Sequence, residues 1–254
     1  MAEPTDPVTL PVADCSLCPF RSKTLLMGRC MPGDTCVFIE SGRQIDRFFR
    51  MNPVYAINYL QDKFWERRAI AVRYVPQKAL TELIHDEDEV VRRAVAYRLP
   101  IQQLHLLIDD SDREVRMTVA DRIAPEHLEQ LANDEDYIVR LTVAKRLPAG
   151  RLFRFIKDPD PQVRKQVAQR LPEVSLGLMA NDGSADIRRI IAERMSAEDA
   201  VLLLHDCDWV VRYTVAQKVA TQHLPPLLDD PEPDVRDLAQ QRLSSTHALD
   251  STHD

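Results

Sequence analysis

The chain has 254 residues, of which 44% are hydrophobic, 29% are charged and 6 are glycine, a composition typical of a helix-rich globular protein. No apolar run approaches the roughly 18 residues of a membrane span, and the first ten residues lack the basic start and apolar block of a signal peptide. We therefore expect a cytoplasmic protein with no membrane partner, and the net charge of −7 argues against nucleic acid as its main partner.

Four of the five cysteines lie close together near the start of the chain. Cys15, Cys18, Cys30 and Cys36 form a C-x2-C-x11-C-x5-C pattern. A reducing cytosol disfavours a structural disulfide pair, and four thiolates in so short a stretch have the number required for one metal centre. Zinc ribbons usually carry two C-x2-C pairs, whereas one pair and two widely spaced cysteines favour a [4Fe-4S] cluster. We expect residues 1–52 to form a cysteine-rich cluster module with these four ligands, and zinc is the alternative.

Residues 53–76 read as a degenerate repeat. Asp62 and the closing Pro76 keep the register of the repeats that follow, but Arg67 stands where valine is expected, with Phe64 and Trp65 nearby. The pattern predicts a capping unit between the cysteine-rich module and the repeats, where an atypical surface is required.

Residues 77–244 contain seven 24-residue repeats. Arginine recurs at this interval, each time after valine or isoleucine, at Arg92, Arg116, Arg140, Arg164, Arg188, Arg212 and Arg236. A fixed period of this length is typical of a solenoid, in which each repeat packs on its neighbours. Residues 245–254 would then form a C-terminal tail.

Each repeat predicts one α-helix. In Asp160–Pro172, an aspartate N-cap precedes Pro161 at the first helical position, and Val163, Val167 and Leu171 fall on one stripe before the closing proline. The same pattern predicts helices over Asp88–Leu99, Asp112–Ile123, Asp136–Leu147, Ser184–Met195, Asp208–Val219 and Glu232–Leu243.

The rest of each repeat is short and carries leucines at helical spacing, as in Leu104, Leu107 and Ile108. Five or six residues cannot fill two α-helical turns, so a short 3₁₀-helix is the favoured prediction. A strand is the rival, but these segments show no alternation and few β-branched residues. We expect an all-α solenoid without a β-sheet.

The repeating charges have a structural interpretation. Aspartates recur at the interval of the arginines, at Asp86, Asp110, Asp134, Asp158, Asp182, Asp206 and Asp230. They predict a ladder of ion pairs between neighbouring repeats. A second row of cations, Arg98, Arg122, Arg146, Arg170, Arg194, Lys218 and Arg242, lies in the last helical turn, where a cation complements the helix C-terminus. The functional alternative for this second row is a basic stripe for phosphates or acidic peptides.

The sequence resembles the leucine-rich repeat variant family over essentially its whole length. The resemblance rests on the C-x2-C-x11-C-x5-C head, the Asp-x-Asp-x-x-Val-Arg helix start and the Val-Ala-x-Arg-Leu-Pro helix end, as in Asp158–Pro172. It implies repeats of one α-helix and one 3₁₀-helix in a right-handed superhelix, with Cys15, Cys18, Cys30 and Cys36 as [4Fe-4S] ligands. No enzymatic activity comes with this resemblance. A HEAT-like repeat of the bilin-lyase type shares the helix start, but its two full helices do not fit into so short a repeat.

We expect a monomeric, non-enzymatic scaffold that binds a protein partner of unknown identity and responds to redox or iron status. An electron-transfer protein that delivers electrons from the cluster to a docked partner is the alternative. A second alternative is a structural zinc head on a solenoid that binds nucleic acid or acidic peptides. No nucleotide-binding glycine loop or hydrolase motif is present. Cys207 is expected to be a free loop cysteine, and the histidines show no ligand spacing.

Overall fold

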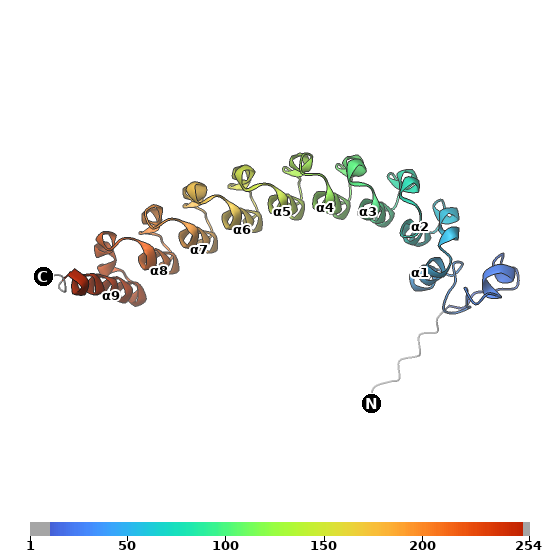
Figure 1. The fold of residues 1–254 in the computed structure, drawn as a ribbon, viewed down its shortest axis with the longest axis horizontal. Helices are drawn as coiled ribbons and strands as arrows, with labels where there is room; N and C mark the ends of the chain where they lie inside the picture. Colours follow the sequence, from blue (N-terminus) through green and yellow to red (C-terminus); the bar gives the residue numbers. More distant parts are fainter. Residues whose placement is uncertain (1–10, 251–254) are drawn as a thin grey trace, which may run out of the picture. The chain divides into compact units, whose positions relative to one another are not determined.

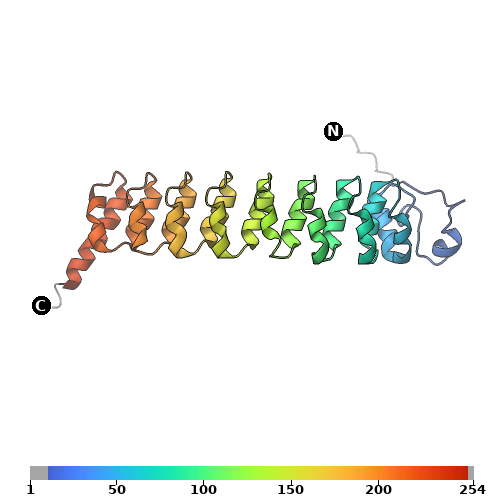
Figure 2. The ribbon, with the colours of Figure 1, turned by 90° about the horizontal axis from the view of Figure 1, so that it is seen from above.

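The structure, a computed structural model, describes residues 11–250, with side chains through residue 245. The first ten residues of the expected cysteine-rich module and residues 251–254 of the expected tail lie outside the described residues. The chain divides after Leu131 into two compact units. In each unit the α-helices form one layer and the short helices form a second (Figure 1), and neighbouring α-helices lie side by side when seen from above (Figure 2).

The first unit contains the head and the first repeats. Its α-helices are α1 (Gly42–Met51), α2 (Trp65–Val72), α3 (Glu89–Arg98) and α4 (Arg113–Arg122). A π-helical turn, η1 (Arg21–Leu25), precedes them, and the 3₁₀-helices are η2 (Pro53–Tyr59), η3 (Gln77–Leu83), η4 (Ile101–Leu107) and η5 (Leu128–Leu131).

The second unit continues the same alternation. Its α-helices are α5 (Tyr137–Arg146), α6 (Pro161–Arg170), α7 (Ala185–Arg194), α8 (Trp209–Lys218) and α9 (Pro233–Asp250). Its 3₁₀-helices are η6 (Ala149–Phe155), η7 (Glu173–Met179), η8 (Asp199–Leu203), η9 (Thr221–His223) and η10 (Pro225–Asp229). Helix α9 runs beyond the last repeat, so the described part of the expected tail is helical.

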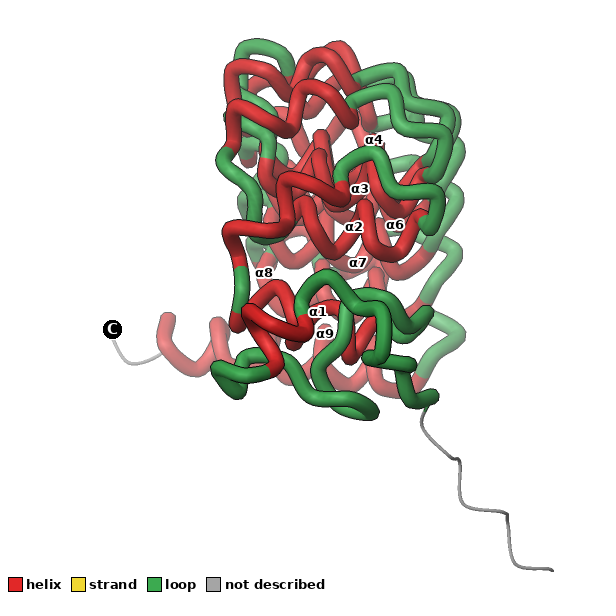
Figure 3. Tube along the Cα trace, turned by 90° about the vertical axis from the view of Figure 1, so that its right-hand side faces the viewer, coloured by secondary structure: helices red, strands yellow, loops and turns green. Residues whose placement is uncertain are grey.

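The expected all-α solenoid is confirmed. Residues 11–250 contain helices and loops but no strand (Figure 3), and their β-type pairing is an isolated bridge between Met31 and Thr35. The short elements are 3₁₀-helices, as their length predicted, so the strand alternative is wrong for these segments. None of the helices in this part of the chain is long and apolar enough to cross a membrane.

The helix starts follow the aspartate pattern. The side chain of Asp88 accepts a hydrogen bond from the backbone N–H of Val90, and Asp160 accepts one from Gln162, with Pro161 at the first helical position. Such caps satisfy backbone donors that have no partner within the helix. Ser184 occupies the same position before α7 but accepts no capping hydrogen bond through its side chain.

The core runs between the two layers. Val163 and Val167 in α6 and Leu171 at its C-cap are at most 1% exposed, as the stripe predicted. The short helices contribute Leu152 and Leu176, which are 0% exposed and belong to the same core. Because each repeat contributes only one such stripe, its apolar side chains are buried largely by contact with neighbouring repeats.

Truncation of the central stripe tests this arrangement. We expect Val167→Ala to lower the free energy of unfolding by about 1–3 kcal/mol, because it leaves a cavity in a well-packed core. A central lesion of this kind is also expected to weaken coupling along the array, so that urea unfolding separates into two transitions. The control is Gln169→Ala, an exposed position in the same helix. Equal stability of the two variants would contradict the assignment.

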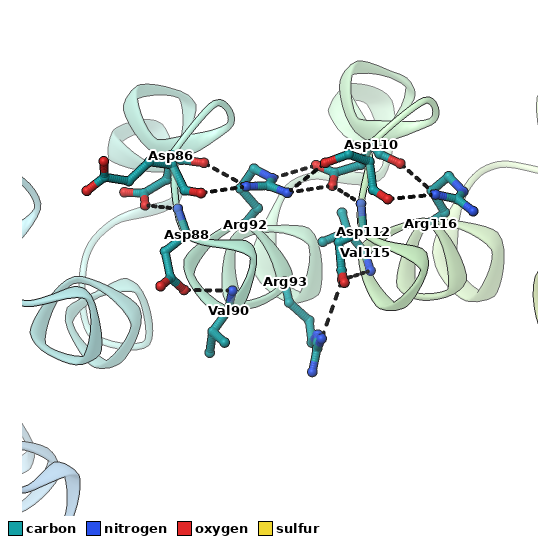
Figure 4. Close-up of polar contacts among 11 residues, drawn as sticks. Asp86, Asp88, Val90, Arg92, Arg93, Asp110, Asp112, Val115 and Arg116 are labelled. Atoms are coloured by element: carbon teal, nitrogen blue, oxygen red, sulfur yellow. Dashed lines mark hydrogen bonds and ion pairs between the residues drawn. The ribbon is translucent and has the colours of Figure 1, made fainter.

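The predicted ladder of ion pairs links consecutive repeats (Figure 4). Arg92 donates through Nε to Asp110 Oδ2 at 2.8 Å and through Nη2 to Asp110 Oδ1 at 2.9 Å, while its Nη1 donates to the carbonyl of Asp86. Asp110 also accepts from the backbone N–H of Asp112 at 2.9 Å. Its hydrogen bonds to Arg92 raise the pKa of that guanidinium. The equivalent pairs are Arg140–Asp158, Arg164–Asp182, Arg188–Asp206 and Arg212–Asp230.

The ladder begins one repeat earlier than the sequence indicated. Arg68 lies one repeat length before Arg92 and makes the same two hydrogen bonds, both 2.8 Å long, with Asp86. The side chain of Asp62 accepts a hydrogen bond from the backbone N–H of Phe64, two residues later. The ladder aspartates Asp86 and Asp110 accept the same kind of bond. The degenerate unit therefore keeps the ion pair of a regular repeat. The period alone could have identified Arg68, whose preceding residue is Arg67 rather than valine.

The second row of cations caps the preceding helix rather than its own. Arg194 donates to the carbonyls of Ala168 at 2.5 Å and Leu171 at 2.8 Å, which lie at the end of α6. Arg98, Arg122, Arg170, Lys218 and Arg242 contact the preceding helix end in the same way. These contacts satisfy carbonyls that a helix C-terminus leaves without partners. The observed contacts favour a structural role over a basic stripe.

Candidate metal centre

The first two cysteines lie in a tight turn at the start of the described chain. The backbone N–H of Cys18 donates to the carbonyl of Cys15 at 3.4 Å, and the N–H of Arg21 donates to the carbonyl of Cys18 at 3.0 Å. Both thiols are partly exposed, and Leu17 between them is 95% exposed. The turn therefore presents two sulfurs at the surface of the head.

A helical turn and a glycine bring the third cysteine back. After η1, Gly28 has a φ of +68°, a left-handed conformation that glycine adopts without steric cost. The N–H of Arg29 then donates to the carbonyl of Thr24 at 2.8 Å. This bond closes the turn directly before Cys30, which is 8% exposed.

A second glycine turn joins the last two cysteines. Met31 and Thr35 exchange backbone hydrogen bonds of 2.9 and 2.8 Å, and between them Gly33 has a φ of +80°. Cys30 and Cys36 flank this small loop, and both are buried. The sequence places glycine where the backbone requires a positive φ, so the x5 spacing between these cysteines folds as one closed turn.

Two buried amides fasten the cysteine loops to α1. The side chain of Asn52 donates to the carbonyl of Arg29 at 2.7 Å and to that of Phe48 at 3.0 Å. Gln44 donates to the carbonyl of Pro11 at 3.0 Å, and its own backbone carbonyl accepts from the N–H of Cys36 at 3.2 Å. Gln44 lies one repeat length before Arg68, so α1 stands in the register of the repeats, with glutamine at the ladder position.

An aromatic cluster forms the rest of the head's core. The ring of Phe20, two residues after Cys18, lies 5.9 Å from Phe38, 5.1 Å from Phe48 and 4.8 Å from Tyr55, measured between centroids. Such tilted contacts add to the gain from burial. The segments that carry the cysteines are therefore packed on α1 and on the start of η2.

The four thiols influence one another electrostatically. The pKa of Cys30 is raised to about 11, chiefly by burial and also by the charges that Cys36, Cys18 and Cys15 can carry, while a hydrogen bond with Thr24 acts to lower it. Burial also raises the pKa of Cys15, again with contributions from Cys18 and Cys36. All four are free thiols. The four predicted ligands thus lie in one segment packed on α1, and none of them forms a disulfide bond.

Zinc and an iron–sulfur cluster place different demands on the four sulfurs. In the part of the chain that the structure describes, no three His, Cys, Asp or Glu side chains group closely enough to hold a single ion. One zinc ion would draw four sulfurs to about 2.3 Å from a common centre. A cluster binds each sulfur through a different iron and therefore needs a wider set.

The fifth cysteine lies elsewhere. Cys207 is exposed in the loop before α8, in the second unit, and its sulfur accepts a hydrogen bond from Arg188 Nη2 at 3.1 Å. Among the described residues it joins no group of metal ligands. His105 and His127 lie with ring centroids 6.3 Å apart but also form no such group.

The head is attached to the first repeat helix through polar contacts. The hydroxyl of Tyr74 donates to Asp46 Oδ1 at 2.9 Å, and Arg73 Nη1 lies 3.3 Å from the same carboxylate. Arg67 Nη2 donates to the carbonyl of Phe38 at 3.3 Å. Sequence reasoning missed this interface, and of its residues only Arg67 stood out, as an arginine at an apolar register position.

Comparison with known proteins agrees with both parts of the molecule. Residues 11–58 match a family model described as "LRV protein FeS4 cluster". An 87-residue stretch is 36% identical to an "Uncharacterized 27.7 kDa protein in nifB 3'region" of Rhodobacter capsulatus. That stretch is 34% of this chain, and the chain spans about a third (35%) of the length of this curated relative.

The repeats have a solved counterpart. A structure described as a leucine-rich repeat variant with a novel repetitive protein structural motif is 59% identical and superposes with a TM-score of 0.83. The match covers 92% of this chain and 100% of the solved chain. With its 24-residue repeats and its iron–sulfur head, the chain belongs to the leucine-rich repeat variant family.

Proposed function

We propose that the protein is a non-enzymatic, cytoplasmic scaffold that binds a protein partner along its repeats and carries a [4Fe-4S] cluster on Cys15, Cys18, Cys30 and Cys36 that reports redox or iron status. The scaffold role is supported by the different roles of the repeated and the variable residues in each repeat. The repeated charges and apolar stripes serve contacts between repeats. The exposed positions differ from repeat to repeat, so the differing residues supply recognition.

The second unit shows an exposed apolar surface on its 3₁₀-helical layer. Leu178 and Leu202 hold equivalent positions in neighbouring repeats and are 64% and 68% exposed, and Phe153 on η6 is 61% exposed. Large apolar side chains exposed in neighbouring repeats are typical of a surface that binds protein. An acidic net charge and cations engaged at helix ends support a protein partner over nucleic acid, and we propose a monomer.

Exposure of the first cysteine turn favours electron transfer as the second candidate function. Leu17, between Cys15 and Cys18, is almost fully exposed, so a docked protein could reach the edge of the cluster. The same cluster can serve either use, and the two differ in whether the partner is bound through the head or through the repeats.

Anaerobic purification and partner capture test the proposal. We expect brown protein with equal amounts of iron and sulfide, and a captured partner that differs in amount between cluster-loaded and cluster-free protein. Phe153→Asp, Leu178→Asp and Leu202→Asp together should abolish capture. Gln169→Asp with Gln217→Asp, exposed positions on the α-helical layer, should not. Colourless protein with one zinc per chain would refute the redox role, and capture lost only through head variants would favour electron transfer.

A further inference from the structure

Arg67 occupies a position that is apolar in the regular repeats. Its counterpart in the next repeat is Val91, which is 0% exposed. The Arg67 side chain is 14% exposed, and its Nη1 donates to Asp62 Oδ1 at 2.8 Å. Its guanidinium carbon lies 5.3 Å from the centroid of the Phe64 ring. A charge that is costly to bury thus replaces a core valine in α2, the helix that packs on α1.

The guanidinium of Arg67 lies near the cysteines. Its Nη2 donates to the carbonyl of Phe38 at 3.3 Å. Phe38 is two residues from Cys36, a span of at most about 7 Å. Tyr59 connects the same groups: its pKa is raised to about 12, chiefly by burial, with the Arg67 charge acting against the rise and charges on Asp62, Cys18 and Cys36 contributing to it. Arg67 and two of the proposed ligands therefore act on one buried phenol.

One donor of Arg67 has no partner. Its Nε is buried and makes no hydrogen bond with any described residue. Such orphaned donors are rare, because burial removes water without replacing it. An anionic group in the adjacent site would offset this cost. A [4Fe-4S] core with four thiolates carries a net charge of about −2, which becomes about −3 when one electron is added.

We propose that Arg67 tunes the cluster from the first repeat helix, raising its reduction potential by stabilising the extra negative charge of the reduced state. The role of Arg67 rests on the proposed assignment of the cluster to the four cysteines. Positive charge favours the more negative of two redox states, and burial limits screening by water and salt. Because Arg67 belongs to α2, its charge stays beside the cluster only while the head is docked on the repeats.

Anaerobic redox titration of the full-length, cluster-loaded chain tests this role, with dithionite as the one-electron donor that is itself oxidised. We expect Arg67→Gln to shift the midpoint to more negative potential by about 59 mV, a tenfold change in the ratio of reduced to oxidised cluster at fixed potential. Arg67→Lys should retain most of the wild-type potential. Asp62→Asn, which removes the opposing charge and keeps an acceptor oxygen, should shift the midpoint upward.

The control is Lys78→Gln. Lys78 is exposed on η3 in the same unit and makes none of the contacts between the head and α2 described above, so loss of its charge should leave the potential unchanged. Unchanged potentials for Arg67→Gln and Asp62→Asn in iron-loaded protein would overturn the role of Arg67. If the Arg67→Gln variant does not retain iron, an unchanged midpoint potential in the Asp62→Asn variant is by itself sufficient to overturn the role of Arg67. Absence of iron from the wild-type chain would instead refute the proposed function.

Discussion

Asp110→Asn should lower the free energy of unfolding by about 3–5 kcal/mol, a large part of what holds a domain folded. Asp110 accepts two hydrogen bonds from the Arg92 guanidinium and one from its own loop (Figure 4). The side chains of this pair are only 13% and 5% exposed. Removing one partner therefore leaves an uncompensated buried charge, which is far more destabilising than the loss of a surface ion pair.

The neighbouring residue supplies the control. Asp109 is exposed, and Asp109→Asn makes the same chemical change one position earlier in the same loop. Urea unfolding should show a change of at most about 0.5 kcal/mol for this variant. Equal changes in the free energy of unfolding for Asp109→Asn and Asp110→Asn would show that the Arg92–Asp110 ion pair contributes little to stability. A double variant, Arg92→Met with Asp110→Leu, should recover part of the loss because no buried charge is left alone.

The repeat itself could be predicted from the sequence because its signals are local. A 24-residue period, aspartate caps and a stripe such as Val163, Val167 and Leu171 depend only on neighbouring residues in the chain. The ladder followed from the same period. The capping of the preceding helix by Arg194 did not, because the bonded carbonyls belong to residues 23 and 26 positions earlier. The Arg194 guanidinium meets these carbonyls only because consecutive repeats stack on one another.

The head was less predictable for a related reason. Spacing identified the four cysteines, but it gave no indication that α1 stands in the register of the repeats. At the ladder position α1 carries Gln44, whose hydrogen bond to Pro11 replaces the usual ion pair. Asn52, which holds the cysteine loop through Arg29, has no sequence signature either. Both are amides whose roles depend on loop geometry, and short-range patterns do not encode it.

Removal of the cluster should unfold the head and leave the repeats folded. Cys30 and Cys36 are buried, and an elevated pKa keeps the Cys30 thiol neutral at pH 7 in the absence of metal. Metal binding displaces these protons, so part of the binding free energy becomes folding free energy of a segment with a small core. Helices α3 to α9 are stabilised by their own apolar stripes and ion pairs.

Hydrogen exchange measured by mass spectrometry, on anaerobic protein before and after iron chelation, resolves this difference by segment. We expect backbone amides of residues 11–58 to lose protection on iron removal, and those of α3 to α9 to keep it. Cys30→Ser and Cys36→Ser should reproduce the unprotected head without chelation and should lower the iron content. Cys207→Ser should change neither quantity, because Cys207 lies outside the head. A head that stays protected after complete iron loss would show that the aromatic cluster around Phe20 and Phe48 folds it without metal, and that the four cysteines are not structural ligands.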